Sequence, residues 1–253
     1  MNLLQILSTA LRLYSNHTGW HLLAGFALFL FTLISFGLFS CALIASMFIA
    51  APYGVEGGWA HNWLAIVEIA GALFVGLLVA SFVLFAAMGA FIHTCAQVGA
   101  GVREITVMGF LEYAHRFSFT FWIIGMVQTV LGSVVALPFL LLTPLLSSLW
   151  GPLILLGPAL AGIAFFLMQW PVWLAMQAQV VDRRGALGSI ALAWRTSVSA
   201  PLTGLVALVL TGIAFAALLP MLIFYPIYFF FIFMPLATDF ALVYYEAARG
   251  LLK

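Results

Sequence analysis

Residues 63–96 read WLAIVEIAGALFVGLLVASFVLFAAMGAFIHTCA, a run of 34 residues in which Glu68 is the only charged side chain. A helix that crosses the hydrocarbon core of a bilayer needs about 20 mainly apolar residues. The run is therefore long enough to cross a bilayer with several residues to spare. We interpret it as a transmembrane helix, and the rest of the chain contains further runs of the same kind.

The whole 253-residue chain shares this apolar character. It is 66% hydrophobic and 6% charged, and its mean hydropathy is +1.24. A soluble domain is roughly 25% charged, so this composition excludes a water-soluble fold. The net charge of +1 gives no basic surface of the kind that binds nucleic acid. We expect membrane lipids as the immediate partners, and no nucleic acid.

Six runs have the length and apolarity of membrane spans, and short turns rich in proline and glycine separate several of them. The runs lie near residues 20–51, 63–96, 118–143, 152–179, 201–220 and 226–246. Irregular backbone is tolerated in lipid only where it is buried or hydrated, so such turns belong at the membrane surface. The sequence predicts an all-α polytopic membrane protein with about six transmembrane helices in one domain.

The basic residues predict the orientation of these helices. All of them fall before the first span, between the second and third, between the fourth and fifth, or after the sixth: Arg12, Arg103, Arg116, Arg183, Arg184, Arg195, Arg249 and Lys253. Basic residues accumulate in cytoplasmic loops, so we expect both termini in the cytoplasm. Tryptophans near the expected span ends support these boundaries: Trp20, Trp59, Trp63, Trp122, Trp150 and Trp194.

Three cytoplasmic segments look alike and suggest an internal repeat. Residues 6–12, 110–116 and 189–195 align without gaps, and each segment ends in Ala-x-Arg. Gly125 and Gly204 each lie nine residues after the arginine of their copy. Chance similarity among apolar segments is the alternative explanation.

The first of these segments has the pattern of a helix that lies on the membrane surface. Leu4, Leu7 and Leu11 share one helical face, while Thr9 and Arg12 fall on another. We therefore predict three repeat units, each an interfacial amphipathic helix followed by a transmembrane hairpin. The units cover about residues 1–98, 99–180 and 181–253.

Several stretches resemble a known group of proteins. They are residues 95–125, 180–189 leading to Ala193-Trp194-Arg195, and the closing Tyr225-Pro226 and Tyr244-Tyr245-Glu246. The chain resembles uncharacterised bacterial inner-membrane proteins of about this length and, more distantly, the membrane domain found beside glycerophosphodiester phosphodiesterases. The resemblance implies a multi-pass, six-helix protein of unassigned function in the bacterial cytoplasmic membrane. It transfers no activity, because the soluble catalytic domain of those phosphodiesterases has no counterpart here.

Asp239 is the strongest candidate for a functional polar group. It lies ten residues before Arg249, or about 15 Å along a helix, and a carboxylate inside a bilayer needs a partner or a wet cavity. We expect a buried contact with Arg116, Arg195 or His93 from another repeat that fixes the packing of the units. Ion or proton coupling through Asp239 is the alternative.

Glutamine amides in or near the third and fourth spans add to this candidate intramembrane site. Such amides hydrogen-bond neighbouring helices or line a polar path, and helix contact is the commoner use. They are Gln128, Gln169, Gln177 and Gln179. Gln169 joins the candidate site of Asp239, Arg116, Arg195 and His93.

The histidines and cysteines do not predict a cofactor. His17, His21, His93 and His115 are all expected near the cytoplasmic side, where four imidazoles could bind a metal ion or a haem. His17 and His21, spaced i, i+4, have no carboxylate or cysteine beside them in the sequence and so match no specific site. Cys41 and Cys95 lie in apolar stretches, and we interpret both as small core residues. The prediction is no metal site and no cofactor.

No catalytic motif stands out in the chain. It has no phosphate-binding Gly-Lys loop, no His-Glu-x-x-His, no Cys-x-x-Cys and no Gly-x-Ser-x-Gly elbow, so an enzyme is disfavoured. We expect a non-catalytic structural, assembly or accessory subunit that docks onto other membrane protein subunits. The alternative is a transporter or channel for a small or lipid-like solute, which internal repeats and Asp239 would suit. A dry ion pair at Asp239 would favour the first function, and a hydrated cavity the second.

Overall fold

The computed structural model describes residues 3–55, 63–100, 106–149, 151–199, 209 and 225–251. Nearly all of these residues are helical, which confirms the predicted all-α class. The helices are α1 (Leu3–Asn16), α2 (Thr18–Val55), α3 (Trp63–Gly99), α4 (Val107–Leu141), α5 (Thr143–Leu149), α6 (Leu156–Asp182), α7 (Ala186–Ser199), α9 (Tyr225–Tyr228) and α10 (Met234–Leu251). A 3₁₀ turn, Gly151–Leu155, precedes α6, and a π-helical turn, Phe229–Phe233, joins α9 to α10.

Five stretches of the described chain are long and apolar enough to cross a membrane. They are Thr18–Phe48, Ile66–Gly99, Val107–Leu146, Leu156–Asp182 and Pro226–Gly250. These stretches coincide with five of the six predicted runs, and the chain is a helical membrane protein. The remaining predicted run, 201–220, lies outside the described residues except for position 209.

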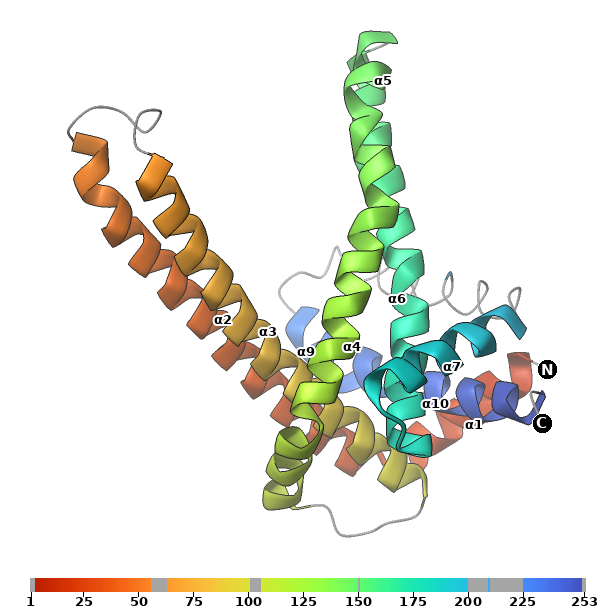
Figure 1. Cartoon of the computed structure of the whole chain (residues 1–253). Coiled ribbons are helices and arrows are strands. Elements are labelled where there is room, and N and C mark those ends of the chain that lie inside the picture. Colours follow the sequence, from red (N-terminus) through yellow and green to blue (C-terminus); the bar gives the residue numbers. More distant parts are fainter. Residues whose placement is uncertain are drawn as a thin grey trace.

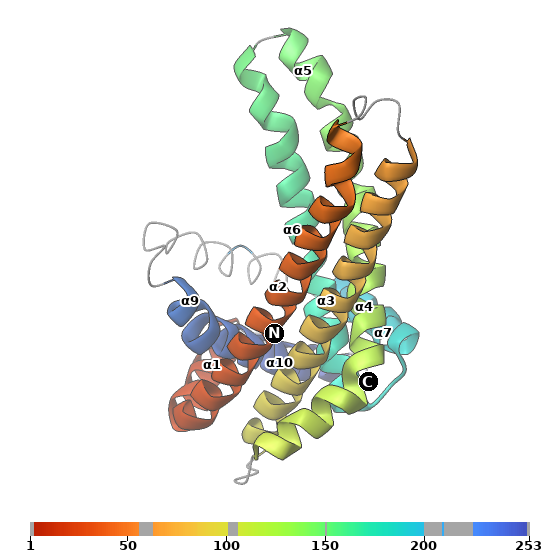
Figure 2. The ribbon, with the colours of Figure 1, turned by 90° about the vertical axis from the view of Figure 1, so that its left-hand side faces the viewer.

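The helices form two arms on a shared base. Helices α2 and α3 make the first arm, and α4 and α6 make the second arm, whose far end is closed by α5 and the 3₁₀ turn (Figure 1). The arms start close together and diverge toward their far ends. At their shared end, α1, α7, α9 and α10 gather around the lower ends of the arms (Figures 1 and 2). We call this end the base.

The packed core of the protein lies in the base. Its members include Leu28 near the start of α2, Phe91 in the second half of α3 and Phe121 in the first half of α4. The far parts of the arms instead expose large apolar side chains, such as Phe48 of α2 and Val134 of α4. In α3, and likewise in α4, only 11% of the most apolar 18-residue segment is buried. The arms therefore offer their sides to lipid or to other helices, while the base holds itself together.

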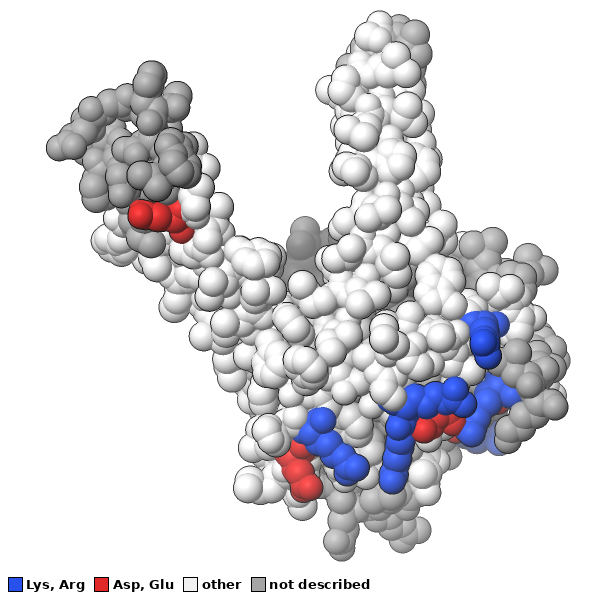
Figure 3. Space-filling model, in the orientation of Figure 1, with Lys and Arg blue, Asp and Glu red and all other residues white. Residues whose placement is uncertain are grey.

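Charge is concentrated in the base as well. On the face shown in Figure 3, basic groups lie on the base and none is visible on the arms. The basic residues of the described chain lie in α1, the start of α4, the turn after α6, α7 and α10: Arg12, Arg116, Arg183, Arg184, Arg195 and Arg249. One end of the molecule is therefore basic, and the two arms leave it on the same side.

One of the three expected interfacial segments is a separate helix, and the third lies in a helix whose described part ends at Ser199. The first copy is α1 and the third lies in α7, but the second forms the first turns of α4 without a break. The Thr18 hydroxyl donates to the carbonyls of Tyr14 and Ser15, 3.0 and 3.2 Å away, where α1 ends. Residues 117–122, which follow the second copy, contain no glycine or proline. The expectation of a separate second helix is therefore wrong, because nothing in that sequence interrupts the helix.

The three copies nevertheless share one pattern of burial. In each Ala-x-Arg the alanine is buried in the base and the arginine is exposed: Ala10 and Arg12, Ala114 and Arg116, Ala193 and Arg195. A small residue lets a helix pack closely, and an arginine two positions further on stays at the surface. The motif has the same local role three times, while the division into three repeat units stays a prediction.

The last apolar run lies across the base, beside α1, rather than alongside the arms (Figures 1 and 2). Pro235 has no N–H, so the carbonyl of Phe231 lacks its usual helical donor. The Tyr14 hydroxyl of α1 donates to that carbonyl instead, at 3.0 Å. Because α10 crosses the direction of the arms, the ten residues between Asp239 and Arg249 do not measure a depth along the arms. The expected depth of about 15 Å therefore does not apply to Asp239.

Helix α2 passes the π-helical turn at Gly25. A Cβ on Gly25 would overlap the carbonyl oxygen of Phe230. Such a close approach of two backbones requires a residue without a side chain. The rings of Phe29 and Phe230 pack edge to face beside it, with centroids 5.3 Å apart. Gly25 therefore sets how closely α2 meets the segment that leads into α10.

We predict that Gly25→Ala destabilises the protein relative to Gly37→Ala. A Cβ on Gly37 would meet no atom within 4 Å, and both substitutions gain the same helix propensity, about 1 kcal/mol. Their difference isolates the overlap with Phe230, which should cost about 1–3 kcal/mol. Thermal unfolding in detergent, followed by tryptophan fluorescence, measures this difference. Equal stability of the two variants would contradict the close contact.

Candidate functional site

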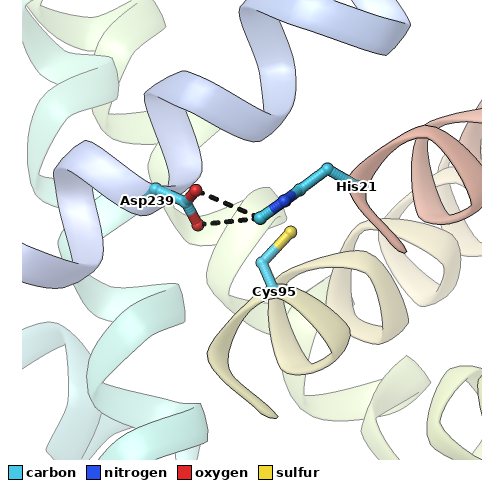
Figure 4. Close-up of side chains that lie close together, drawn as sticks. All are labelled: His21, Cys95 and Asp239. Carbon is cyan, nitrogen blue, oxygen red and sulfur yellow. Dashed lines mark hydrogen bonds and ion pairs between the residues drawn. The ribbon is translucent and has the colours of Figure 1, made fainter. Parts of the chain in front are cut away.

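Three side chains of types that can bind a ligand or take part in a reaction meet inside the base. His21 comes from α2, Cys95 from α3 and Asp239 from α10 (Figure 4). Each is only 1% exposed. One ligand atom from each lies within 4.8 Å of the other two. We call this group the His-Cys-Asp cluster, and it joins three helices that are far apart in the sequence.

His21 and Asp239 are in direct contact. Nε2 of the imidazole lies 3.2 Å from Oδ1 of Asp239, with which it forms a hydrogen bond, and 3.1 Å from Oδ2. Oδ2 has no hydrogen-bond partner among the described residues. One carboxylate oxygen is therefore hydrogen-bonded to the histidine, and the other lies in ion-pair range of the same nitrogen without hydrogen-bond geometry.

The second ring nitrogen of His21 settles how many protons the pair holds. Nδ1 lies 3.1 Å from the backbone carbonyl of His17, and a carbonyl oxygen only accepts, so Nδ1 carries a proton. The hydrogen bond between Nε2 and Asp239 needs one more. Whether this proton sits on the imidazole or on the carboxyl group, the pair as a whole is neutral. A neutral pair is far cheaper to bury than a lone carboxylate.

Local structure explains why these groups point inward. His21 lies one turn into α2, just after the break at His17 that redirects the chain from α1. Cys95 lies on the buried stripe of α3, four residues after Phe91 and three before Val98. Asp239 lies one turn after Pro235, beyond the π-helical turn. Single π-helical turns often occur at functional sites.

Tyr14 covers the cluster from the side of α1. Its ring centroid lies 5.4 Å from that of His21. Burial raises the pKa of Tyr14 above its usual value of 10.0, and the charge of Asp239 raises this pKa further. The phenol therefore stays protonated at neutral pH and keeps donating to the Phe231 carbonyl. Helix α1 is held over the cluster by this bond.

The interior of the protein holds further buried polar atoms that no described residue satisfies. They are the Thr94 and Thr238 hydroxyls, Oε1 of Gln177, Nδ1 of His93 and Nε1 of Trp170. Nε2 of Gln177 does reach the backbone carbonyl of Thr238, at 3.5 Å. Buried polar atoms without protein partners are where proteins bind ordered water or ions.

The partner of Asp239 differs from the one expected. The sequence led us to Arg116, Arg195 or His93, but the contact is with His21. Arg116 and Arg195 are exposed, and long charged side chains reach water more cheaply at the surface than they pair inside a core. The expected ion pair with an arginine is therefore wrong.

His93 and the glutamines take other places. His93 packs against the rings of Tyr113 and Phe117 in α4, with centroids 4.1 and 5.2 Å away. The side chain of Gln169 lies outside the described part of the structure. Gln128 donates to the Met168 carbonyl in α6, so this amide joins neighbouring helices.

One signal in the sequence bears on the residues that were missed. His21 lies nine residues after Arg12, where the other two copies of the repeat have Gly125 and Gly204. A bulky polar residue in place of two glycines marks a position with a different role. Cys95 gave no comparable signal, because a buried cysteine in an apolar helix looks like any small core residue.

A second ion pair fastens α6 to α10 at the edge of the base. Nη2 of Arg249 lies 2.7 Å from Oδ1 of Asp182, and the Tyr245 hydroxyl donates to Oδ2 of the same carboxylate. The next residue, Arg183, has a left-handed backbone conformation with φ of 52°. The chain turns from α6 toward α7 at Arg183. Both oxygens of the Asp182 carboxylate have partners, Arg249 and Tyr245. This ion pair therefore has a structural role.

A cavity of about 290 Å³ lies near the cluster, between α3, α6 and α10. His93, Gln97 and Glu246 give it polar walls, and apolar residues such as Leu242 and Val180 complete it. None of the three cluster residues lines this cavity. The three residues of the His-Cys-Asp cluster are nevertheless buried, each with 1% of its surface exposed.

We compared the chain with protein-family models, with curated proteins and with solved structures, and none of them matches it. The function has to be argued from the residues themselves.

We predict that His21 and Asp239 stabilise the protein only as a pair. His21→Leu alone or Asp239→Leu alone leaves a buried polar partner behind and should cost about 3–5 kcal/mol. The double variant removes both polar groups and should be more stable than either single variant. Thermal unfolding of all four proteins in detergent gives the coupling energy. If the two single effects simply add in the double variant, the residues are not coupled.

Proposed function

We propose that the protein is a non-catalytic integral membrane subunit that supports the assembly of a larger membrane complex. The observation that carries this proposal is the environment of Asp239. Both Asp239 and His21 are 1% exposed, and their contact joins α2 to α10 away from the neighbouring cavity. A buried, paired carboxylate fixes helix packing, whereas ion or proton coupling needs a hydrated path to it.

Exposed glycines on the arms support docking of further helices. Gly37 in α2, Gly71 in α3 and Gly162 in α6 are exposed, and a Cβ at any of them would meet no atom within 4 Å. Glycine costs about 1 kcal/mol relative to alanine inside a helix, so lipid contact alone does not favour it there. Small residues in membrane helices let a second helix approach closely. The diverging arms leave these positions open to a partner.

The arginines of the base suggest how the protein is oriented in the membrane. Arginines at one end favour placing the base in the cytoplasm, with the arms crossing the membrane away from it. Both ends of the described chain, in α1 and α10, lie in the base (Figure 1). We propose the bacterial inner membrane as the location, on the resemblance described above. Lipids would cover whatever part of the arms a partner leaves free.

An apolar groove favours a second candidate function, carriage of a small or lipid-like solute. The groove measures about 220 Å³ and lies between the start of α2 and the start of α4, with Ala27, Phe31 and Phe110 among its walls. Its apolar lining suits part of an acyl chain. Lipid that copurifies in fixed proportion and is lost in Ala27→Trp, with no protein partner present, would favour carriage over assembly.

We predict that a leucine at the exposed glycines blocks the partner without unfolding the protein. Gly37→Leu, Gly71→Leu and Gly162→Leu each place a side chain in open space, so the unfolding temperature should stay close to that of the wild type. A partner helix that packs there would be displaced. The protein is extracted from native membranes in mild detergent, and proteins that copurify are quantified by mass spectrometry. At least one of the variants should lose a stoichiometric partner.

Val134→Leu provides the matched control, because Val134 is exposed on α4 and is already large. This variant should keep the partner. The proposal fails if the wild-type protein purifies alone, or if every glycine variant retains the same partners as the wild type.

A further inference from the structure

We infer that the His-Cys-Asp cluster is a binding site for a divalent transition-metal ion of the Zn²⁺ type. Zn²⁺ takes thiolate, imidazole and carboxylate ligands, and His21, Cys95 and Asp239 offer one of each. Hard cations such as Mg²⁺ and Ca²⁺ prefer oxygen ligands alone, and soft Cu⁺ prefers sulfur. The mixed donor set therefore selects a borderline metal.

The geometry of the cluster is close to that of such a site. Ligand atoms around a tetrahedral Zn²⁺ lie about 3.3–3.8 Å apart, given bond lengths of about 2.0–2.3 Å. Nε2 of His21 and Oδ2 of Asp239 are 3.1 Å apart, and all three ligand atoms lie within 4.8 Å of one another. Small side-chain shifts of about 1 Å would close a three-ligand site, which leaves a fourth position for water.

Two further features prepare these groups for a metal ion. A metal-bound histidine usually donates its other ring N–H to a carbonyl or carboxylate, and Nδ1 of His21 already faces the His17 carbonyl. Oδ2 of Asp239 is buried and has no hydrogen-bond partner among the described residues. The histidine is therefore held in the right tautomer, and a carboxylate oxygen is available to the metal.

Charge balance favours binding in this apolar interior. Ionised Cys95 and Asp239 carry two negative charges, and neutral His21 carries none, so a divalent cation makes the site neutral. Binding releases two protons, one from the Cys95 thiol and one from the His21–Asp239 hydrogen bond. The metal would replace that hydrogen bond with bonds to three helices, α2, α3 and α10.

Cobalt titration tests this site, because Co²⁺ replaces Zn²⁺ and reports its ligands by absorption. The full-length protein is purified through a tag without histidine, stripped with a chelator and titrated with Co²⁺ in detergent. We expect one Co²⁺ per chain, a thiolate-to-cobalt charge-transfer band and the visible bands of tetrahedral cobalt. Stoichiometric Zn²⁺ should then remove these bands.

Matched variants assign the ligands. Cys95→Ser should lose the charge-transfer band, and His21→Gln and Asp239→Asn should each weaken binding more than about 100-fold, since loss of a group that merely supports a ligand already costs 10–100-fold. Cys41 is the only other cysteine, and it is exposed, so Cys41→Ser should keep the full spectrum. The unfolding temperature of each stripped protein shows whether it is folded.

The wild-type titration decides the matter even if a variant fails to fold. Absence of a charge-transfer band in the wild type overturns the proposal and leaves Cys95 as a core residue beside a hydrogen-bonded pair. A band that survives in Cys95→Ser but disappears in Cys41→Ser overturns it as well. Neither result bears on the proposed assembly role, which is read from copurifying proteins.

Discussion

A buried carboxylate is the constraint on which the base depends. An unpaired charge inside packed helices costs several kcal/mol, so Asp239 can occupy its place only with a partner. That partner, His21, lies 218 residues away in the sequence, and the contact brings the start of α2 against α10. The bond from Tyr14 to the Phe231 carbonyl and the close approach at Gly25 lie in the same junction. Helices α1, α2 and α10 therefore close as one unit.

The arms follow from this closed base. Helix α3 runs down the first arm and reaches the cluster at Cys95. Helix α4 packs on the second half of α3 through Phe117 and Phe121. Beyond that level the core ends, and the arms separate (Figure 1). In lipid, exposed apolar side chains carry no penalty, so diverging hairpins are tolerated where a soluble protein would collapse. The fold thus pairs a polar, self-contained base with apolar surfaces that are free for lipids or partners.

The sequence predicts the features that depend on the solvent and misses those that depend on neighbours. Five long apolar helical stretches and the clustering of arginines could be predicted, because lipid and water impose them residue by residue. Asp239 stood out for the same reason. Its partner could not be found, since an i, i+4 pattern shows which residues share a face but not which helix meets that face. The resemblance to bacterial inner-membrane proteins stays a prediction.

Two local features were also beyond the sequence patterns. The crosswise course of α10 arises where Pro235 and the π-helical turn meet Gly25 and Tyr14, and none of these residues signals a direction alone. Likewise, Cys95 was correctly expected to be a core residue, but its two companions come from other helices. The same expectation was wrong for Cys41, which is exposed. Helix α1 is separate, as the repeat predicts, whereas the residues after the second copy allow the helix to continue into α4. The residues that follow α7 lie outside the described part of the chain.

Labelling of Cys95 tests most directly whether the base is closed around the His21–Asp239 contact. In a Cys41→Ser background Cys95 is the only thiol of the chain, and its reaction with a small maleimide can be followed in membranes that contain a chelator. We predict that Cys95 is protected in the native protein and becomes reactive in Asp239→Leu. A native Cys95 that reacts as fast as in detergent-denatured protein would contradict it, because the junction of α2, α3 and α10 would then be open.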